Sequence, residues 1–80
     1  MRVEVRLYAT LAAARPNLRA GEPIDLELRD EATLSDLLGG LGIEPRAVHL
    51  AIINGRPVHD RACRLSAGDR VALFPPVGGG

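Results

Sequence analysis

The one convincing helix signal in this sequence is the stretch Thr33-Leu34-Ser35-Asp36-Leu37-Leu38-Gly39-Gly40-Leu41. Its leucines recur with the i, i+3, i+4, i+7 spacing that forms one apolar stripe on an α-helix. Thr33 is a candidate N-cap, and Asp36 predicts a capping box in which aspartate takes the place of glutamate. Gly39 and Gly40 each cost about 1 kcal/mol relative to alanine inside a helix, so we expect a short helix. Gly42 then suits the left-handed position that follows a helix end.

Two strands are predicted before this helix. Apolar and charged residues alternate over residues 3–7 and again over residues 24–29, which is typical of half-buried strands. The alanine-rich segment between them is interrupted by Pro16 and Gly21, so we expect a turn of helix near Leu11 followed by a loop. With only this connection between them, the two strands most simply form a hairpin.

Three further strands are predicted after the helix. Residues 48–53 are continuously apolar apart from His49, and Asn54-Gly55 is the strongest short hairpin signal known for a sequence. Residues 56–58 then form a short return strand, whose proline indicates a sheet edge. Residues 70–74 form a last strand, with apolar side chains on one parity, and Pro75-Pro76 ends it.

This order of elements predicts an α+β fold with one short helix. Such a helix covers only one face of a sheet and would link the hairpin to the second half of the chain as a right-handed crossover. The arrangement is a β-grasp, or ubiquitin-like roll, with a mixed sheet of four to five strands. SH3-like and oligonucleotide-binding barrels compete, but they lack a helix in the middle of the chain. We assign residues 1–76 to the β-grasp domain and residues 77–80 to a C-terminal glycine tail.

Composition narrows the function. The chain has 80 residues, 46% hydrophobic and 25% charged, which indicates a single globular domain. Its formal net charge is zero, which argues against nucleic acid as a partner because that binding needs clustered basic residues. The longest apolar runs, of which Leu50–Ile53 is one, are far shorter than the roughly 20 residues of a membrane span. The alternating start argues against a signal peptide.

The only cysteine is Cys63, which cannot form an intramolecular disulfide and so fits a reducing cytoplasm. Neither His49 nor His59 has metal-site or catalytic-triad spacing with it, so we predict no metal. We interpret Cys63 as a small, partly buried hydrophobic residue.

The sequence ends in Val77-Gly78-Gly79-Gly80, which has two interpretations. Chain ends are commonly frayed, so the glycines could be inert. Alternatively, the terminal carboxylate is the reacting group, because glycine lacks a Cβ and can enter a narrow channel. Four extended residues reach about 13 Å, and Pro75-Pro76 would project them stiffly. We favour the second interpretation because the tail directly follows the last strand of a predicted β-grasp.

A carboxylate must be activated before it reacts, and formation of an acyl-adenylate from ATP is the general biological route. The chain offers neither a phosphate-binding loop nor a catalytic base for this chemistry. We therefore expect it to be the substrate of another protein and not an enzyme.

The C-terminal sequence resembles that of the MoaD/ThiS sulfur carriers. Phe74-Pro75-Pro76-Val77 followed by glycines is most similar to the small, sulfur carrier subunit of molybdopterin synthase. Residues 7–11, residues 33–38 and Asn54-Gly55 also fall where the family has its first strand, helix start and hairpin. Two features depart from the molybdopterin members: a third glycine, more usual in thiamine-pathway carriers, and a short segment over residues 39–45.

The resemblance implies a mechanism. A ubiquitin-activating-like adenylyltransferase would use ATP to adenylate the Gly80 carboxylate, and a sulfur donor would convert it to a thiocarboxylate, or 1-thioglycine. The large subunit of a molybdopterin synthase would then present a pterin precursor as the sulfur acceptor, for a molybdenum or tungsten cofactor. The carrier itself would bind no cofactor.

Other functions stay open. A carrier for thiamine or another sulfur metabolite would use the same chemistry, and a protein modifier would form amide bonds to target lysines. All ten basic residues are arginine, so lysine-linked chains of this protein are excluded. A fourth possibility is a ubiquitin-like binding module with an inert tail.

Strand parity predicts a partner surface beside the tail. If Val5 and Leu7 face the helix, Tyr8 faces away from it, and the same alternation places Ala72 and Phe74 on the helix-free side. The third strand is apolar on both parities, so one of its pairs must also face outward. The predicted partner-binding residues are Gly78, Gly79, Val77, Pro76, Pro75, Phe74, Tyr8, Ala72 and Ile52.

Overall fold

The computed structural model describes residues 1–13 and 15–76 of the chain, and Ala14 and residues 77–80 lie outside it. Its strands are β1 (Arg2–Leu7), β2 (Pro23–Glu27), β3 (Leu50–Ile53), β4 (Arg56–Val58) and β5 (Arg70–Phe74). Its helices are α1 (Thr10–Ala13), α2 (Leu34–Gly40) and a 3₁₀ turn at Pro45–Ala47. None of these helices has the length and apolarity to cross a membrane.

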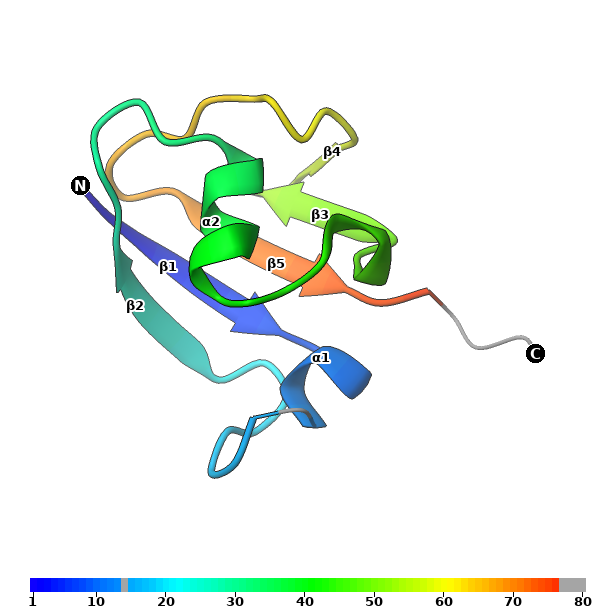
Figure 1. Cartoon of the computed structure of the whole chain (residues 1–80). Helices are drawn as coiled ribbons and strands as arrows, with labels where there is room; N and C mark the ends of the chain where they lie inside the picture. The colour runs from blue at the N-terminus through cyan, green and yellow to red at the C-terminus, as the bar shows by residue number, and fades with distance from the viewer. Residues whose placement is uncertain (14, 77–80) are drawn as a thin grey trace.

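The five strands form one mixed sheet in the order β2-β1-β5-β3-β4 (Figure 1). β1 pairs antiparallel with β2 and parallel with β5, and β3 pairs antiparallel with both β5 and β4. Helix α2 lies across one face of this sheet and connects β2 to β3. This topology confirms the β-grasp prediction, including the N-terminal hairpin and the position of the proline-containing strand β4 at an edge.

Helix α2 begins with the predicted capping box. The backbone N–H of Asp36 donates to Thr33 Oγ1 at 3.2 Å, and the Thr33 N–H donates to Asp36 Oδ2 at 2.9 Å. The bond from the Thr33 N–H is the main reason that the pKa of the Asp36 carboxyl lies below its ordinary value. The helix ends at Gly40, and Gly42 adopts the left-handed conformation with φ +71°.

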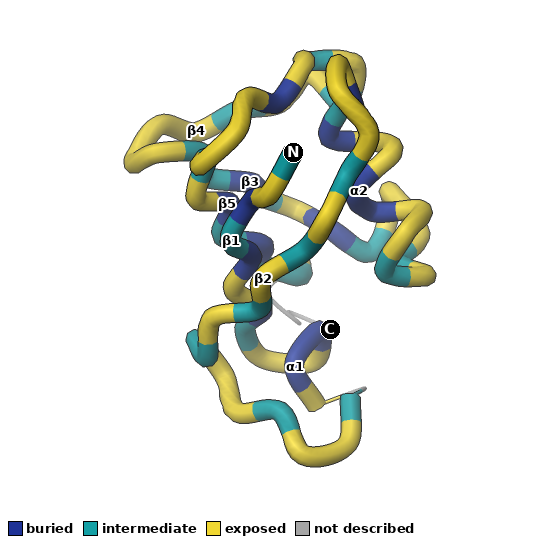
Figure 2. The backbone as a smooth tube through the Cα atoms, turned by 90° about the vertical axis from the view of Figure 1, so that its left-hand side faces the viewer, coloured by how far each residue is buried: buried dark blue, intermediate teal, exposed yellow. Residues whose placement is uncertain are grey.

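The core lies between α2 and the central strands (Figure 2). Val5 pairs with Val71 and Leu7 with Leu73 in the register of β1 and β5, so these four side chains project to the same side of the sheet. All four are buried, as are the three leucines of the helix, Leu34, Leu37 and Leu38. Because the buried side chains alternate along β1 and β5, the other parity of each strand must face away from α2.

The start of strand β3 differs from the sequence prediction. β3 begins at Leu50 and not at Val48, because Val48 is the C-cap of the 3₁₀ turn Pro45–Ala47 and its N–H donates to the Pro45 carbonyl oxygen at 3.1 Å. The His49 N–H still donates to the Phe74 carbonyl oxygen at 2.8 Å, so this segment runs beside β5. The predicted hairpin turn is confirmed, because Asn54 and Gly55 both have positive φ, 52° and 84°.

Candidate functional site

The C-terminal tail follows a central strand of the sheet, β5. We call residues 74–76, where the strand leads into the tail, the tail base. β5 lies between β1 and β3, so its backbone is hydrogen-bonded on both sides before it reaches Phe74. Pro75 and Pro76 follow and are the last described residues. The predicted reacting residue Gly80 and the predicted partner-binding residues Val77, Gly78 and Gly79 lie outside the described part of the chain, so their roles stay predictions.

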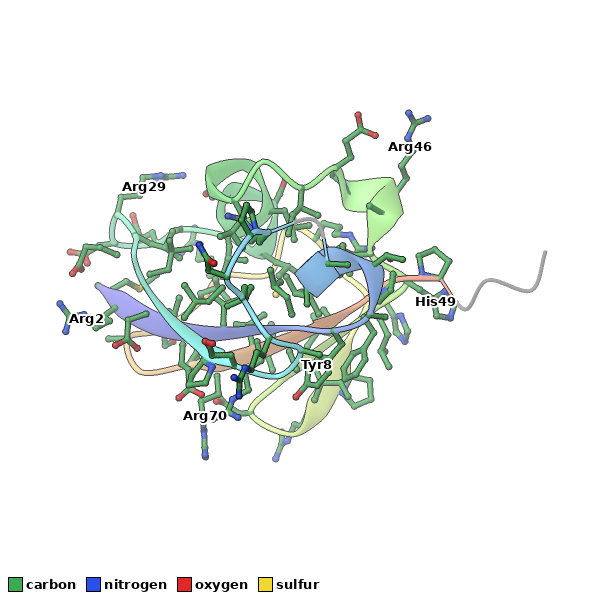
Figure 3. The ribbon with its side chains drawn as sticks, turned by 90° about the horizontal axis from the view of Figure 1, so that it is seen from below. Arg2, Tyr8, Arg29, Arg46, His49 and Arg70 are labelled. Carbon is green, nitrogen blue, oxygen red and sulfur yellow. The ribbon has the colours of Figure 1, made fainter. Side chains whose placement is uncertain are left out.

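The two aromatic side chains of the protein stack on each other. The ring centroids of Tyr8 and Phe74 lie 4.5 Å apart, with an angle of 7° between the ring planes. Their neighbours Leu7 and Leu73 are fully buried toward α2, so both rings project to the opposite side of the sheet. Figure 3 shows Tyr8 on this helix-free side. The parity prediction for both rings is confirmed, and each ring remains partly exposed.

Strand β3 extends the aromatic pair into a patch. Leu50 pairs with Phe74 and Ile52 with Ala72, whereas the intervening Ala51 is fully buried. Sequence parity left two pairs open for the outer face, and the sheet register shows that the outer pair is Leu50 and Ile52. We call the set Tyr8, Leu50, Ile52, Ala72 and Phe74 the outer patch. Leu50 was missing from the predicted site, although it is two residues from the predicted Ile52 and so has the same parity.

Gly21 supports the Tyr8 ring, a role that the sequence analysis missed. Its φ is +76°, and a Cβ added to it would lie 3.2 Å from Cε1 of Tyr8. The Gly21 N–H donates to the Leu7 carbonyl oxygen at 2.8 Å. Its own carbonyl oxygen accepts from Arg6 Nη1 at 3.1 Å. This loop residue is therefore tied to the end of β1 and leaves no room between itself and the aromatic ring.

We expect Gly21→Ala to displace the Tyr8 ring and to destabilise the protein by about 1 kcal/mol or more, because alanine disfavours positive φ and its Cβ crowds the ring. Tyr8 is the only tyrosine and tryptophan is absent, so near-UV circular dichroism reports on this ring. Gly68→Ala is the matched control, because Gly68 has φ +84° but open space around its Cβ. Indistinguishable near-UV spectra of the two variants would contradict the supporting role of Gly21.

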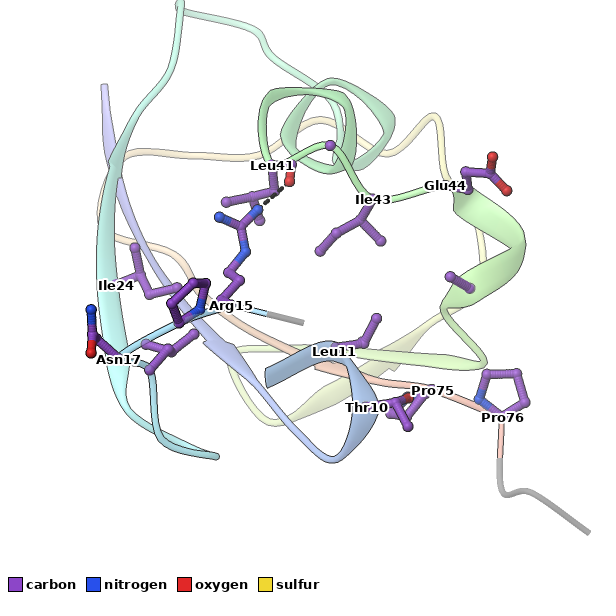
Figure 4. A pocket seen from close by; sticks show the side chains of 14 residues that line it. Thr10, Leu11, Arg15, Asn17, Ile24, Leu41, Ile43, Glu44, Pro75 and Pro76 are labelled. Carbon is purple, nitrogen blue, oxygen red and sulfur yellow. Dashed lines mark hydrogen bonds between the residues drawn. The ribbon is translucent and has the colours of Figure 1, made fainter. Parts of the chain in front are cut away.

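A groove lies on the other side of the tail base (Figure 4). It has a volume of about 1050 Å³ and runs between α1, the loop after it and the segment that follows α2. Arg15 crosses the groove and donates to the Leu41 carbonyl oxygen. Pro75 and Pro76 line one end. The last described residues thus border two surfaces, the outer patch at Phe74 and the groove at the two prolines.

Cys63 lies away from the tail base and has no feature of a reactive thiol. Burial raises the pKa of its thiol, and the negative charge of Asp60 adds to the effect. Little thiolate is therefore present at neutral pH. Its carbonyl oxygen accepts from the Leu34 N–H at 3.0 Å, so the residue helps to connect its loop to the start of α2. Within residues 1–13 and 15–76, no group of three His, Cys, Asp or Glu residues could hold a metal ion.

Comparison with known proteins gives the family. The model of the ThiS family matches residues 6–80, nearly the whole chain with all of its terminal glycines. The chain belongs to the ThiS family. No curated protein sequence matches this ThiS family member.

Solved structures share the fold over its full length. SAMP1 from Haloferax volcanii is 28% identical, with 100% of each chain covered and a TM-score of 0.73. The HVO 2177 protein of the same organism is 30% identical over 100% of this chain and 87% of its own, with a TM-score of 0.73. A chain in the complex of subunits 1 and 2 of molybdopterin-converting factor from Helicobacter pylori is 26% identical, with both chains fully covered and a TM-score of 0.63.

Proposed function

We propose that this ThiS family member is a sulfur carrier for molybdopterin or tungstopterin synthesis, with the Gly80 carboxylate as its reacting group. The observation that carries the proposal is the family match, which extends through Gly78–Gly80 to the last residue. The likeness to a chain of the H. pylori molybdopterin-converting factor supports the pterin pathway. The position of the tail directly after the central strand β5 supports the role of Gly80 as the reacting residue, because a rigid strand presents its end in a defined direction.

The proposed reaction has two steps at one carboxyl group, the first at the α-phosphorus of ATP and the second at the carboxyl carbon. The Gly80 carboxylate attacks the α-phosphate of ATP, which forms the acyl-adenylate and releases pyrophosphate. A sulfur nucleophile at the oxidation level of hydrosulfide then attacks the carbonyl carbon, the bond to AMP breaks, and a thiocarboxylate, 1-thioglycine, remains. Both steps take place in the active sites of partners, so this chain is a substrate that binds no cofactor of its own.

The partners would dock on the outer patch while the tail enters their active sites. Four extended residues span about 13 Å, which is enough to reach a buried reaction centre from the surface of the domain. A ubiquitin-activating-like adenylyltransferase would bind first. The large subunit of a molybdopterin synthase would bind the thiocarboxylate form afterwards. The stacked pair of Tyr8 and Phe74 provides the rigid aromatic surface that is enriched at protein interfaces.

The proposal is tested by reconstitution. The protein is incubated with ATP, an adenylyltransferase and a sulfur donor, and the reaction is followed by pyrophosphate exchange and intact-protein mass spectrometry. We expect exchange that depends on the protein and a mass increase equal to the replacement of one oxygen by one sulfur. Absence of both would overturn the carrier function. The purified thiocarboxylate is then offered to the pterin precursor and to the thiazole precursor of thiamine, each in the presence of the synthase subunit that binds that precursor. Sulfur transfer to the thiazole precursor alone would overturn the pterin assignment.

A second candidate function is protein modification. The observation that favours it is the full-length likeness to SAMP1 of H. volcanii, which is described as a small archaeal modifier protein. Here a lysine amine would attack the Gly80 carbonyl carbon and displace AMP to form an isopeptide bond. The chain has no lysine, so every conjugate would join Gly80 to another protein. Trypsin cleaves after Arg70, so a conjugate would be revealed by tryptic peptides that carry residues 71–80 as a branch on a target lysine, in the same reactions that test for the thiocarboxylate.

We expect Cys63→Ser to leave thiocarboxylate formation and sulfur transfer unchanged. The half-buried side chain packs against the core, so the free energy of unfolding should fall by about 1–2 kcal/mol at most. Chemical denaturation and the mass-spectrometric assay measure the two effects separately. A folded Cys63→Ser variant that acquires no sulfur would show that the thiol takes part in the chemistry.

A further inference from the structure

A notch with two arginines adjoins the outer patch on the same face of the sheet. It has a volume of about 350 Å³, and its lining includes Arg6, Arg70, Ile52 and Ala72. Figure 3 shows Arg70 on the helix-free side, the side that also carries Tyr8. Ile52 and Ala72 belong to the outer patch, so the basic notch and the apolar patch share residues and form one continuous surface.

Of the two arginines that line the notch, Arg6 forms an ion pair with a carboxylate in the part of the chain that the structure describes, and Arg70 does not. Arg6 Nε lies 2.7 Å from Glu4 Oε1, so the charge of Arg6 is largely balanced within the sheet. Among the ion pairs formed by residues 1–13 and 15–76, none includes the exposed Arg70. The adjacent carboxylate of Asp69 is directed into the turn, where it accepts from the Ser66 N–H at 2.8 Å and from Asn54 Nδ2 at 2.9 Å. The guanidinium of Arg70 is therefore the positive charge in the notch that is available to bind a partner.

The backbone that carries Arg70 is held firmly. Its N–H donates to Asn54 Oδ1 at 2.9 Å, and its carbonyl oxygen accepts from the Asn54 N–H at 2.8 Å. On the other side, Arg70 is paired with Glu4 in the parallel register of β5 and β1. A fixed backbone lowers the entropy lost when the side chain binds a partner. The planar guanidinium fork matches a carboxylate in two-point geometry.

We propose that this notch binds a carboxylate on an acidic segment of a protein partner, the adenylating enzyme, whose adjacent apolar side chain packs on the outer patch. The inference rests on the proposed function for the identity of the partner. A polyanion such as RNA fits this surface less well, because Glu4 stands beside Arg6, and Asp25 and Glu27 of β2 share the parity of Glu4 on this face. One unmatched cation beside an apolar patch instead complements a single carboxylate beside an apolar residue.

The first test needs no enzyme. The ¹⁵N-labelled protein is titrated with a synthetic peptide of alternating glutamate and leucine, with its glutamine–leucine counterpart, and with inorganic phosphate. We expect the glutamate peptide to shift the Arg70 side-chain signal and the amide signals of Ile52 and Ala72. Its apparent affinity should fall about tenfold or more in Arg70→Glu, because like charges then face each other. Arg46→Glu is the matched control, since the Arg46 side chain is 88% exposed and lies on the α2 side.

Each other outcome of this titration counts against the proposal. If the glutamine and glutamate peptides gave equal shifts, the surface would bind apolar groups without recognising the carboxylate charge. Equal shifts with phosphate would assign the notch to anions in general, and an absence of shifts at these three residues would remove the notch as a site.

The second test measures adenylation. With Arg70→Glu we expect the KM for this protein to rise about tenfold with kcat unchanged, since the variant alters docking and not the tail. Salt should raise the KM of the natural sequence more steeply than that of Arg70→Ala, because screening removes the attraction. An unchanged KM with Arg70→Glu would overturn the assignment to the adenylating enzyme. If the natural protein is not adenylated at all, the proposed function is wrong. The peptide titration then still decides whether the notch binds a carboxylate.

Discussion

Removal of Gly79 and Gly80 should reduce adenylation to background while leaving the fold unchanged. The truncation takes away the carboxylate that we propose as the reacting group and shortens the tail by half, so the new chain end at Gly78 would not reach a buried active site. The folded domain should be unaffected, because the buried core among the described residues ends at Leu73. Pyrophosphate exchange measures the first effect and the melting temperature the second.

A single substitution, Gly79→Val, tests the width of the tail without changing its length or its terminal carboxylate. Gly79→Val keeps the length of the tail and its terminal carboxylate but adds a branched side chain, and we expect it to block adenylation by widening the segment that enters the partner. Adenylation of the truncated protein at the natural rate would show that the terminal carboxylate is not the reacting group. Normal activity of Gly79→Val would show that no narrow channel receives the tail.

Phe74→Ala should weaken the complex with the large synthase subunit or the adenylating enzyme by about 2 kcal/mol or more, as buried aromatic side chains do at interfaces. The Phe74 ring lies outside the core and is stacked on Tyr8 at the edge of the outer patch. Its removal should change the melting temperature of the free protein only slightly. Isothermal titration calorimetry with the partner and thermal denaturation of the free protein give the two numbers.

Tyr8→Ala tests whether the two rings act as one surface. Because the rings are in contact, the losses of affinity in the two single variants should add up to more than the loss in the double variant. Additive losses would show that the partner contacts each ring independently. A large drop in melting temperature with unchanged affinity would show that Phe74 serves the fold of the free protein and not the interface.

The local elements of this fold could be predicted from the sequence with good accuracy. The leucine spacing and the Thr33–Asp36 pair predicted helix α2 with its cap, and the alternation over residues 70–74 predicted β5 with the bounds that the structure has. Asn54-Gly55 predicted the turn between β3 and β4. Such patterns are readable because they arise from sterics and burial among residues that are close neighbours along the chain.

The face of a strand could be predicted only where apolar and polar residues alternate. This contrast placed Tyr8 and Phe74 correctly on the helix-free side, but it is absent over Leu50–Ile53, where every side chain is apolar. The register of β3 against β5 decided the question, because Ala51 lies opposite the buried Leu73. The 3₁₀ turn that shortens β3 likewise has no periodicity that a sequence would display.

The role that we propose for the C-terminal glycines could be inferred from the sequence alone, because adenylation of Gly80 in a narrow channel requires only a chain end without side chains. The composition of the surface at the end of β5 depended on the tertiary structure. The support of Tyr8 by Gly21, the alignment of Leu50 with Phe74 and the position of Arg70 in a notch with Arg6 all join residues that are distant in sequence. Such neighbours are determined by strand order and register, which arise when several elements bury one shared core, and no single segment contains that information.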